Sequence, residues 1–194
     1  MKIVEVKRIS YYPPSKGYAV LLKEAEGERH LPIIVGSSEA QAIALSLEGV
    51  NMPRPMTHDL LVNILEHLDC EITRVIIANI KNGTFFAEIE ISHPQIGEMS
   101  VDSRPSDAIA VALRNMAPIY VNDDVMESAS VSEISSEEEV NQALTSAGVV
   151  EESSEEGVLE NLTEALEKAV ADEEYEVAAR LRDRIKQLEK KLSS

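Results

Sequence analysis

The chain has 194 residues, of which 44% are hydrophobic, and it carries a formal net charge of −17. This length suffices for one ordinary core plus an appendage. The single cysteine, Cys70, excludes an intramolecular disulfide, and the chain has neither a signal-like N-terminus nor an apolar run of the ~20 residues that span a bilayer. We therefore expect a cytoplasmic protein without a membrane span.

The acidic residues are unevenly distributed. Residues 1–121 contain 11 Lys and Arg against 15 Asp and Glu, a net charge of −4, whereas residues 122–156 contain 11 acidic residues and no basic one. Residues 157–194 contain seven basic and nine acidic residues. Acidic proteins seldom bind nucleic acid, but the N-terminal part is nearly balanced, so charge neither supports nor excludes such a role there.

The beginning of the chain predicts three strands followed by a helix. Apolar residues among charges indicate strands over residues 2–10, 18–22 and 31–35, separated by turn sequences. Residues 38–48 carry apolar side chains at the helical spacing i, i+3, i+4, i+7, and Gly49 is placed to end this helix.

After an additional helix, the same order of elements repeats. Asn82-Gly83 is the strongest hairpin signal in the chain. The expected elements are helices over residues 57–69 and from residue 106, and strands over residues 71–81, 85–91, 98–101 and 118–121. We therefore predict an α+β fold of duplicated β-β-β-α units, with mostly antiparallel or mixed sheets packed with helices.

The C-terminal third has a different composition. We predict a first domain over residues 1–125, then an acidic flexible linker over residues 126–156 that contains a short helix near residues 140–144. Apolar residues spaced alternately by three and four predict a helical hairpin over residues 157–192. Because so short a segment cannot bury much core alone, it should pair with itself, with another copy or with another protein.

Two segments, fifty residues apart, each place an arginine, a proline, a hydroxyl residue and an aspartate at the start of a helix. They read Pro53-Arg54-Pro55-Met56-Thr57-His58-Asp59 and Asp102-Ser103-Arg104-Pro105-Ser106-Asp107. Thr57 and Ser106 are expected to be N-caps, worth about 1 kcal/mol each. Aspartates in the first turn also suit the helix macrodipole.

Capping does not explain Arg54, Arg104 or His58. A cation just before a helix N-terminus is unfavourable unless it pairs with a carboxylate or an anion. In the structural interpretation, Arg104 forms an ion pair with a nearby aspartate. In the functional interpretation, the arginines and the helix N–H groups hold a phosphate, while His58 and the aspartates handle a proton or a metal.

The N-terminal region resembles the bifunctional nuclease family over about residues 1–125. Four blocks agree in order and spacing: Leu31-Pro32-Ile33-Ile34-Val35-Gly36, Glu39-Ala40-Gln41-Ala42-Ile43-Ala44, and the two helix starts above, extended to Leu60 and Ala110. The resemblance implies cleavage of both DNA and RNA. It also implies a compact α+β fold of repeated β-β-β-α units, in agreement with the element order.

The resemblance fixes no mechanism, so the site assignments are our own. We expect Arg54 and Arg104 to bind the phosphate of a nucleic-acid substrate. The catalytic candidates are His58 as general acid or base, with Asp59 and Asp107. Asp102, together with Asp59 or Asp107, is the candidate ligand of a divalent metal, Mg²⁺ or Mn²⁺.

The C-terminal segment resembles the UVR motif, a helical hairpin shared by UvrB and UvrC repair proteins and some Clp-associated proteins. The resemblance rests on residues 162–185, including Ala178-Ala179 and Arg182-Asp183, and implies a protein partner for residues 157–192. A non-catalytic adaptor or ligand-binding module, recruited to a repair or Clp-type proteolysis complex, is therefore the alternative function. A homo-oligomer is also an open alternative.

Overall fold

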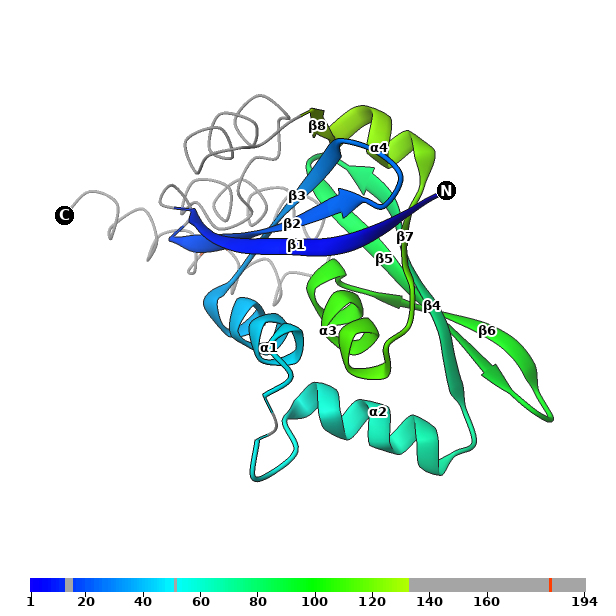
Figure 1. Cartoon of the computed structure of the whole chain (residues 1–194). Coiled ribbons are helices and arrows are strands. Elements are labelled where there is room, and N and C mark those ends of the chain that lie inside the picture. The colour runs from blue at the N-terminus through cyan, green and yellow to red at the C-terminus, as the bar shows by residue number, and fades with distance from the viewer. Residues whose placement is uncertain (13–15, 51, 133–181, 183–194) are drawn as a thin grey trace. The chain divides into compact units, whose positions relative to one another are not determined.

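The computed structural model describes residues 1–12, 16–50, 52–132 and 182. The chain divides into two units, Met1–Val149 and Val150–Ser194, and all elements described below belong to the first (Figure 1). The predicted short helix near residues 140–144 and the predicted hairpin over residues 157–192 lie outside the described residues.

Eight strands form one sheet in the order β6-β5-β4-β7-β1-β2-β3-β8. The strands are β1 Lys2–Tyr12, β2 Gly17–Glu24, β3 Arg29–Val35, β4 Glu71–Lys81, β5 Thr84–His93, β6 Gly97–Ser103, β7 Ile119–Val121 and β8 Val131–Ser132. Only β4 and β7 run parallel, and every other neighbouring pair is antiparallel. The predicted α+β class with a mixed, mostly antiparallel sheet is confirmed.

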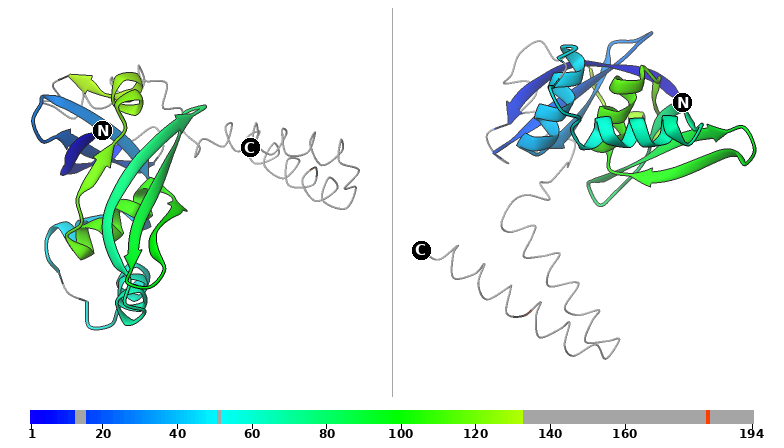
Figure 2. Two further views of the ribbon diagram at one scale, coloured as in Figure 1. Left: turned by 90° about the vertical axis from the view of Figure 1, so that its right-hand side faces the viewer. Right: turned by 90° about the horizontal axis from the view of Figure 1, so that it is seen from below.

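Three of the four helices within residues 1–132 pack together. The helices are α1 Ser37–Leu47, α2 Thr57–His67, α3 Pro105–Asn115 and α4 Asp123–Ala129. Both α1 and α2 contact α3, and Figures 1 and 2 show α3 between them. Five consecutive residues of α3, from Ala108 to Ala112, have no exposed surface, so this helix forms the centre of the core.

The predicted duplication is visible in the sheet. The strands β1-β2-β3 and β4-β5-β6 follow one another outward on opposite sides of β7. Because β7 is antiparallel to β1 but parallel to β4, the two units are related approximately by a half-turn about an axis perpendicular to the sheet at β7. Such a rotation keeps α1 and α3, which follow the third strand of each unit, on the same face of the sheet.

Turn residues end several elements as expected. Gly49, directly after the C-cap of α1, has a φ of 66°, in the left-handed region that favours glycine. Asn82 and Gly83, with φ values of 49° and 78°, join β4 to β5 in the manner of a type I′ turn.

The predicted N-caps are wrong. Thr57 is the first residue of α2 and Ser106 the second residue of α3, while the capping positions belong to Met56 and Arg104. Pro105 takes the first helical position of α3, where its missing N–H costs nothing because that group has no helical partner.

The folded region extends beyond the predicted boundary at residue 125. Helix α4 buries Val125, Met126 and Ala129, and β8 pairs with β3. Residues 126–132, which we expected in the acidic linker, therefore belong to the sheet domain. None of the described helices is long and apolar enough to cross a membrane.

Candidate functional site

The two predicted helix starts meet through His58 on α2 and Asp107 on α3. Nε2 of His58 lies 3.0 Å from Oδ1 of Asp107. Because an ionised carboxylate only accepts hydrogen bonds, Nε2 carries a proton and donates it. Both side chains are shielded, with 15% and 30% of their surfaces exposed. This contact leaves Nδ1 of His58 as the ring nitrogen that can accept a proton.

Arg104, at the N-cap of α3, connects Asp107 to Glu39 on α1. Its Nε and Nη2 donate to the two oxygens of Asp107 at 2.7 and 3.2 Å, and its Nη1 donates to Glu39 Oε1 at 3.2 Å. The Ser38 hydroxyl donates to the other oxygen of Glu39 at 3.0 Å. The Arg104 side chain is 66% exposed, so its remaining N–H groups are open to an anion from solvent.

Asp59 holds α2 against the rest of the domain. One of its oxygens accepts the backbone N–H of Met56 at 2.7 Å, and the other forms a short ion pair with Arg114 of α3. Arg114 also donates to the carbonyls of Ala42 and Ala110, so it joins three helices. Burial opposes ionisation of Asp59, but these hydrogen bonds outweigh it and lower the pKa of its carboxyl.

The carboxylates around Arg104 are ionised at neutral pH. Burial opposes the charge on Asp107, but hydrogen bonds from Arg104 and His58 outweigh it and lower the pKa of that carboxyl. A hydrogen bond from its own backbone N–H is the largest cause that lowers the pKa of Glu39, with Arg104 contributing further. Asp107 raises the pKa of Arg104 in turn, so this guanidinium remains charged.

The duplication explains how the carboxylates of α1 and α3 come together. Glu39 is the third residue of α1, and Asp107 is the third residue of α3. The half-turn that relates the two units therefore places equivalent first-turn carboxylates on both sides of Arg104. Helix α2, which has no counterpart in the duplication, adds His58 and Asp59 from one side.

Two predicted site residues lie outside this cluster. Arg54 is exposed in the loop before α2, and within the described part of the chain it forms no hydrogen bond or ion pair. Asp102 is exposed on β6, opposite Glu88 of β5 in the strand register. Among the described residues, the cluster thus joins His58, Asp59, Asp107 and Arg104 but neither of these two.

The side chains of this cluster can be compared with the ligands that the expected divalent metal would need. Among the residues that the structure describes, no group of three or more His, Cys, Asp or Glu side chains could hold a metal ion. Glu39 and Asp107 are both bound by Arg104. The donor set therefore does not fit a resident metal, and the role of Asp102 as a ligand stays a prediction.

Sequence reasoning missed Glu39 and Arg114 as members of the site. Glu39 belongs to the Glu39–Ala44 block that carries the family resemblance, but a carboxylate in the first turn of a helix is also explained by the helix macrodipole alone. Arg114 follows Asp107 by seven residues, two helical turns, and therefore lies on the same face of α3. This spacing is the signal that could have found it.

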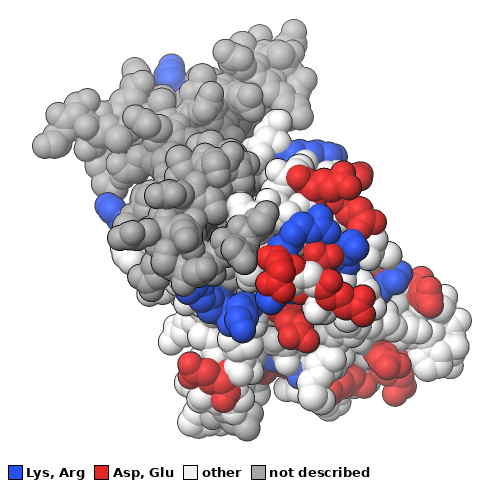
Figure 3. Space-filling view, turned by 45° about the horizontal axis from the view of Figure 1, so that its top comes forward, with Lys and Arg blue, Asp and Glu red and all other residues white. Residues whose placement is uncertain are grey.

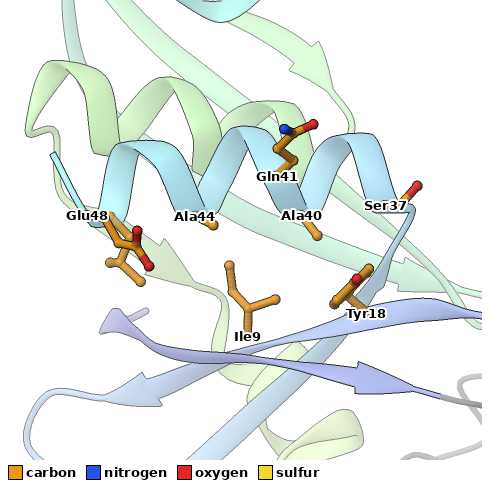
Figure 4. Close-up of a pocket in the computed structure, with 8 residues that line it drawn as sticks. Ile9, Tyr18, Ser37, Ala40, Gln41, Ala44 and Glu48 are labelled. Atoms are coloured by element: carbon orange, nitrogen blue, oxygen red, sulfur yellow. The ribbon is translucent and has the colours of Figure 1, made fainter. Parts of the chain in front are cut away.

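A separate pocket of about 380 Å³ lies on another face of α1. Ala40 and Ala44 point from the helix toward Ile9 of β1 and Tyr18 of β2 (Figure 4). The hollow exists because the two alanine methyl groups are too short to fill the space above the strands. None of the clustered acid, arginine or histidine side chains lines it.

Comparisons with known proteins agree with the two resemblances. The family profile of the bifunctional nuclease domain matches residues 20–133, and that of the UvrB/UvrC motif matches residues 156–191. The first match contains every residue of the cluster.

Individual relatives support the first match. An uncharacterised protein of Mycobacterium tuberculosis is 41% identical over 128 residues, which is 66% of this chain and 76% of the relative. Bifunctional nuclease 2 of Arabidopsis thaliana is 30% identical over 118 residues, 58% of this chain and 34% of that protein. Bifunctional nuclease 1 of Oryza sativa subsp. japonica is 28% identical over 110 residues, 54% of this chain and 33% of that protein.

Proposed function

Because the chain belongs to the bifunctional nuclease domain family, we propose that its sheet domain hydrolyses phosphodiester bonds in DNA or RNA. The observation that carries this proposal is the contact of His58 with Asp107, beside the exposed guanidinium of Arg104. It brings together, from segments 49 residues apart, a proton acceptor, a carboxylate that orients it and a phosphate-binding cation.

His58 would serve as the general base. With Asp107 fixing the proton on Nε2, Nδ1 removes a proton from a water molecule as the water oxygen bonds to phosphorus. The bond from phosphorus to the leaving oxygen then breaks, and that oxygen takes up a proton. Asp107 acts by holding the imidazole in one tautomer and one orientation.

Arg104 would bind the scissile phosphate. Its guanidinium is held by Asp107 and Glu39 on one side and open to solvent on the other, so it can donate to non-bridging phosphate oxygens without moving. Arg54 lies outside the cluster, so its expected contact with a phosphate stays a prediction. Asp59 would position His58 by tying α2 to Arg114, rather than touch the substrate.

Whether cleavage requires the expected Mg²⁺ or Mn²⁺ is a separate question, which the assay tests. Such an ion can enter with the substrate, because Mg²⁺ commonly uses one or two carboxylates together with phosphate oxygens. No step above depends on it.

The test is a cleavage assay with fluorescently labelled single-stranded DNA, double-stranded DNA and RNA, each in Mg²⁺, in Mn²⁺ and in EDTA. His58→Ala should lower the cleavage rate by about a hundredfold or more, which is the usual contribution of a general base. Asp107→Asn should cause a comparable loss, since it removes the charge that orients the imidazole. Arg104→Gln should chiefly raise KM.

His67→Ala is the matched control for these variants. His67 is an exposed histidine in the last turn of the same helix, and its Nδ1 contacts the carbonyl of Asn63 within that helix. Its loss should leave the rate unchanged. Cleavage that persists unaltered in both His58→Ala and Asp107→Asn would place the activity in another site or in a contaminant.

The ion pairs themselves favour a second candidate function, the non-catalytic adaptor. Glu39, Asp59 and Asp107 are all engaged by arginines, as they would be in a purely structural network. The match of residues 156–191 to the UvrB/UvrC motif supports docking to a protein partner under either function. Absence of cleavage with all three substrates under all three metal conditions would favour the adaptor.

A further inference from the structure

The outer face of α2 exposes an uninterrupted row of large aliphatic side chains. Leu60, Leu61 and Ile64 lie on the helix and Leu68 at its C-cap, with exposed fractions between 39% and 58%. We call these four residues the α2 stripe. Contiguous apolar surface of this kind is characteristic of a binding surface rather than of a face that remains in water.

The inner face of α2 is only weakly anchored. Val62 is its one buried residue, and Leu65 is partly buried against the core. Helices of 11 residues are marginal in water and depend on packing of their apolar face. Here more aliphatic surface points outward than inward, so α2 requires a further apolar surface over the stripe.

We propose that the α2 stripe pairs with the α2 stripe of a second copy of this chain, in an antiparallel arrangement. The stripe is symmetric about Ile64, because Leu60 precedes it by four residues and Leu68 follows it by four. A two-fold axis at Ile64 places Leu60 of one copy opposite Leu68 of the other, over a contact about 12 Å long. No charged side chain belongs to the stripe.

The charges at the two ends of α2 also match in this arrangement. The exposed Arg54 lies just before the helix, at its positive end, whereas the exposed carboxylates of Glu66, Asp69 and Glu71 lie at its other end. Antiparallel pairing brings Arg54 of each copy toward the acidic end of the other. A parallel arrangement would instead oppose like charges, so the charge pattern selects the antiparallel one.

This interface would affect the acid–base cluster without contributing a residue to it. His58 and Asp59 lie on the inner face of the helix whose outer face carries the stripe. Covering the stripe would hold α2 in place and with it the contact between His58 and Asp107. The dimer does not depend on the proposed nuclease activity and can be tested without it.

The test is sedimentation velocity of the full chain over a range of concentrations. The wild-type chain should sediment as a dimer, and Ile64→Glu should raise Kd by about a hundredfold or more, because two carboxylates would meet at the axis in an apolar contact. Asn63→Glu is the matched control, since it adds the same charge to an exposed position of α2 beside the stripe. Circular dichroism verifies that both variants are folded.

A cross-linking experiment locates the axis even where Ile64→Glu fails to fold. In a Cys70→Ser background, Ile64→Cys should form an intermolecular disulfide on mild oxidation, whereas Glu66→Cys on the same helix should not. A wild-type chain that remains monomeric at all concentrations would overturn the proposal. So would a dimer that survives Ile64→Glu unchanged, or one in which Ile64→Cys fails to cross-link.

Discussion

Asp107 is the residue through which the cluster is connected, because its two oxygens accept hydrogen bonds from both His58 and Arg104. The lowered pKa of its carboxyl keeps it ionised well below neutral pH. The hydrogen bonds contribute their full stability at pH values above the pKa of this carboxyl in the unfolded chain. As the pH falls through the lower pKa of the folded state, the carboxyl becomes neutral and this stability is lost. The cluster is therefore intact throughout the neutral range and disassembles only in acid.

Arg114 is the residue on which the position of α2 depends most. Its side chain is only 9% exposed, and it bonds to groups on α1, α2 and α3. Arg114→Ala should lower the free energy of unfolding by about 3 kcal/mol, because it leaves the Asp59 carboxylate without its partner. Arg114→Lys should cost less but still destabilise, since an ammonium cannot reproduce the fork of the guanidinium. Urea unfolding measures both.

Arg74→Ala is the appropriate comparison for this prediction. Arg74 pairs with Glu90 across β4 and β5, but its side chain is 39% exposed. Its removal should cost much less than the removal of Arg114, because exposed ion pairs contribute little to stability. Equal losses for Arg74→Ala and Arg114→Ala would show that Arg114 does not act as a buried clamp.

At the scale of elements, the sequence patterns predicted those features that depend on neighbouring residues. The Asn82-Gly83 turn and the end of α1 at Gly49 follow from local conformational preference. Helix α4 was missed because the acidic composition of residues 122–156 placed the predicted start of the linker at residue 126, within this helix. Only tertiary packing of Val125 and Met126 makes that segment part of the domain.

The candidate site was predicted only in part for the same reason. His58, Asp107 and Arg104 stand out because they occur at helix starts with unusual chemistry. The pair of Arg104 with Asp107 is local. The contact of Arg104 with Glu39 depends instead on the half-turn between the two units, and the contact of Arg114 with Asp59 depends on the packing of α2. A pattern of spacings encodes neither arrangement. Hence Arg104 reaches Glu39 on α1, 65 residues away, and not Asp102.

The end of α3 gives a prediction at this scale. Met116, the C-cap, has a φ of 53° and is 92% exposed, so a bulky side chain is held in the left-handed region without contributing burial. Met116→Gly should raise the free energy of unfolding by about 0.5–1 kcal/mol, because glycine adopts this conformation without steric strain. The midpoint of urea unfolding should rise accordingly.

Met116→Val provides the opposite case. A β-branched side chain tolerates positive φ less well than methionine, so this variant should unfold at lower urea concentration than the wild type. If glycine and valine shifted the midpoint in the same direction, side-chain contacts rather than backbone conformation would determine the stability at this position.

On the scale of the whole molecule, the duplication changes the meaning of the fifty-residue spacing between the two Arg-Pro segments. The structural repeat relates α1 to α3 and therefore Glu39 to Asp107, whereas α2 stands outside it. The likeness between the segments that begin α2 and α3 is thus not the internal repeat of the fold. They meet because α2 packs against the helix at the centre of the core.

Net charge is the property of the whole molecule that bears most on the proposed substrate. Acidic and basic side chains are interspersed over the described surface in Figure 3, without a broad basic region on this face. Residues 133–156 add eight glutamates and no basic residue to a domain, residues 1–132, that contains 11 basic and 18 acidic residues. Their tethered negative charge should repel a nucleic acid and lower its rate of association with the sheet domain.

Replacing these eight glutamates with glutamine should therefore strengthen binding of a labelled single-stranded oligonucleotide to the full-length chain. The gain should be several-fold at about 50 mM salt and nearly absent at about 1 M, where the screening length falls to about 3 Å. Fluorescence anisotropy in EDTA, with His58→Ala as the background, measures binding without cleavage. A gain in affinity that persists at high salt would have to come from something other than charge. No gain in affinity at low salt would show that residues 133–156 do not influence substrate binding.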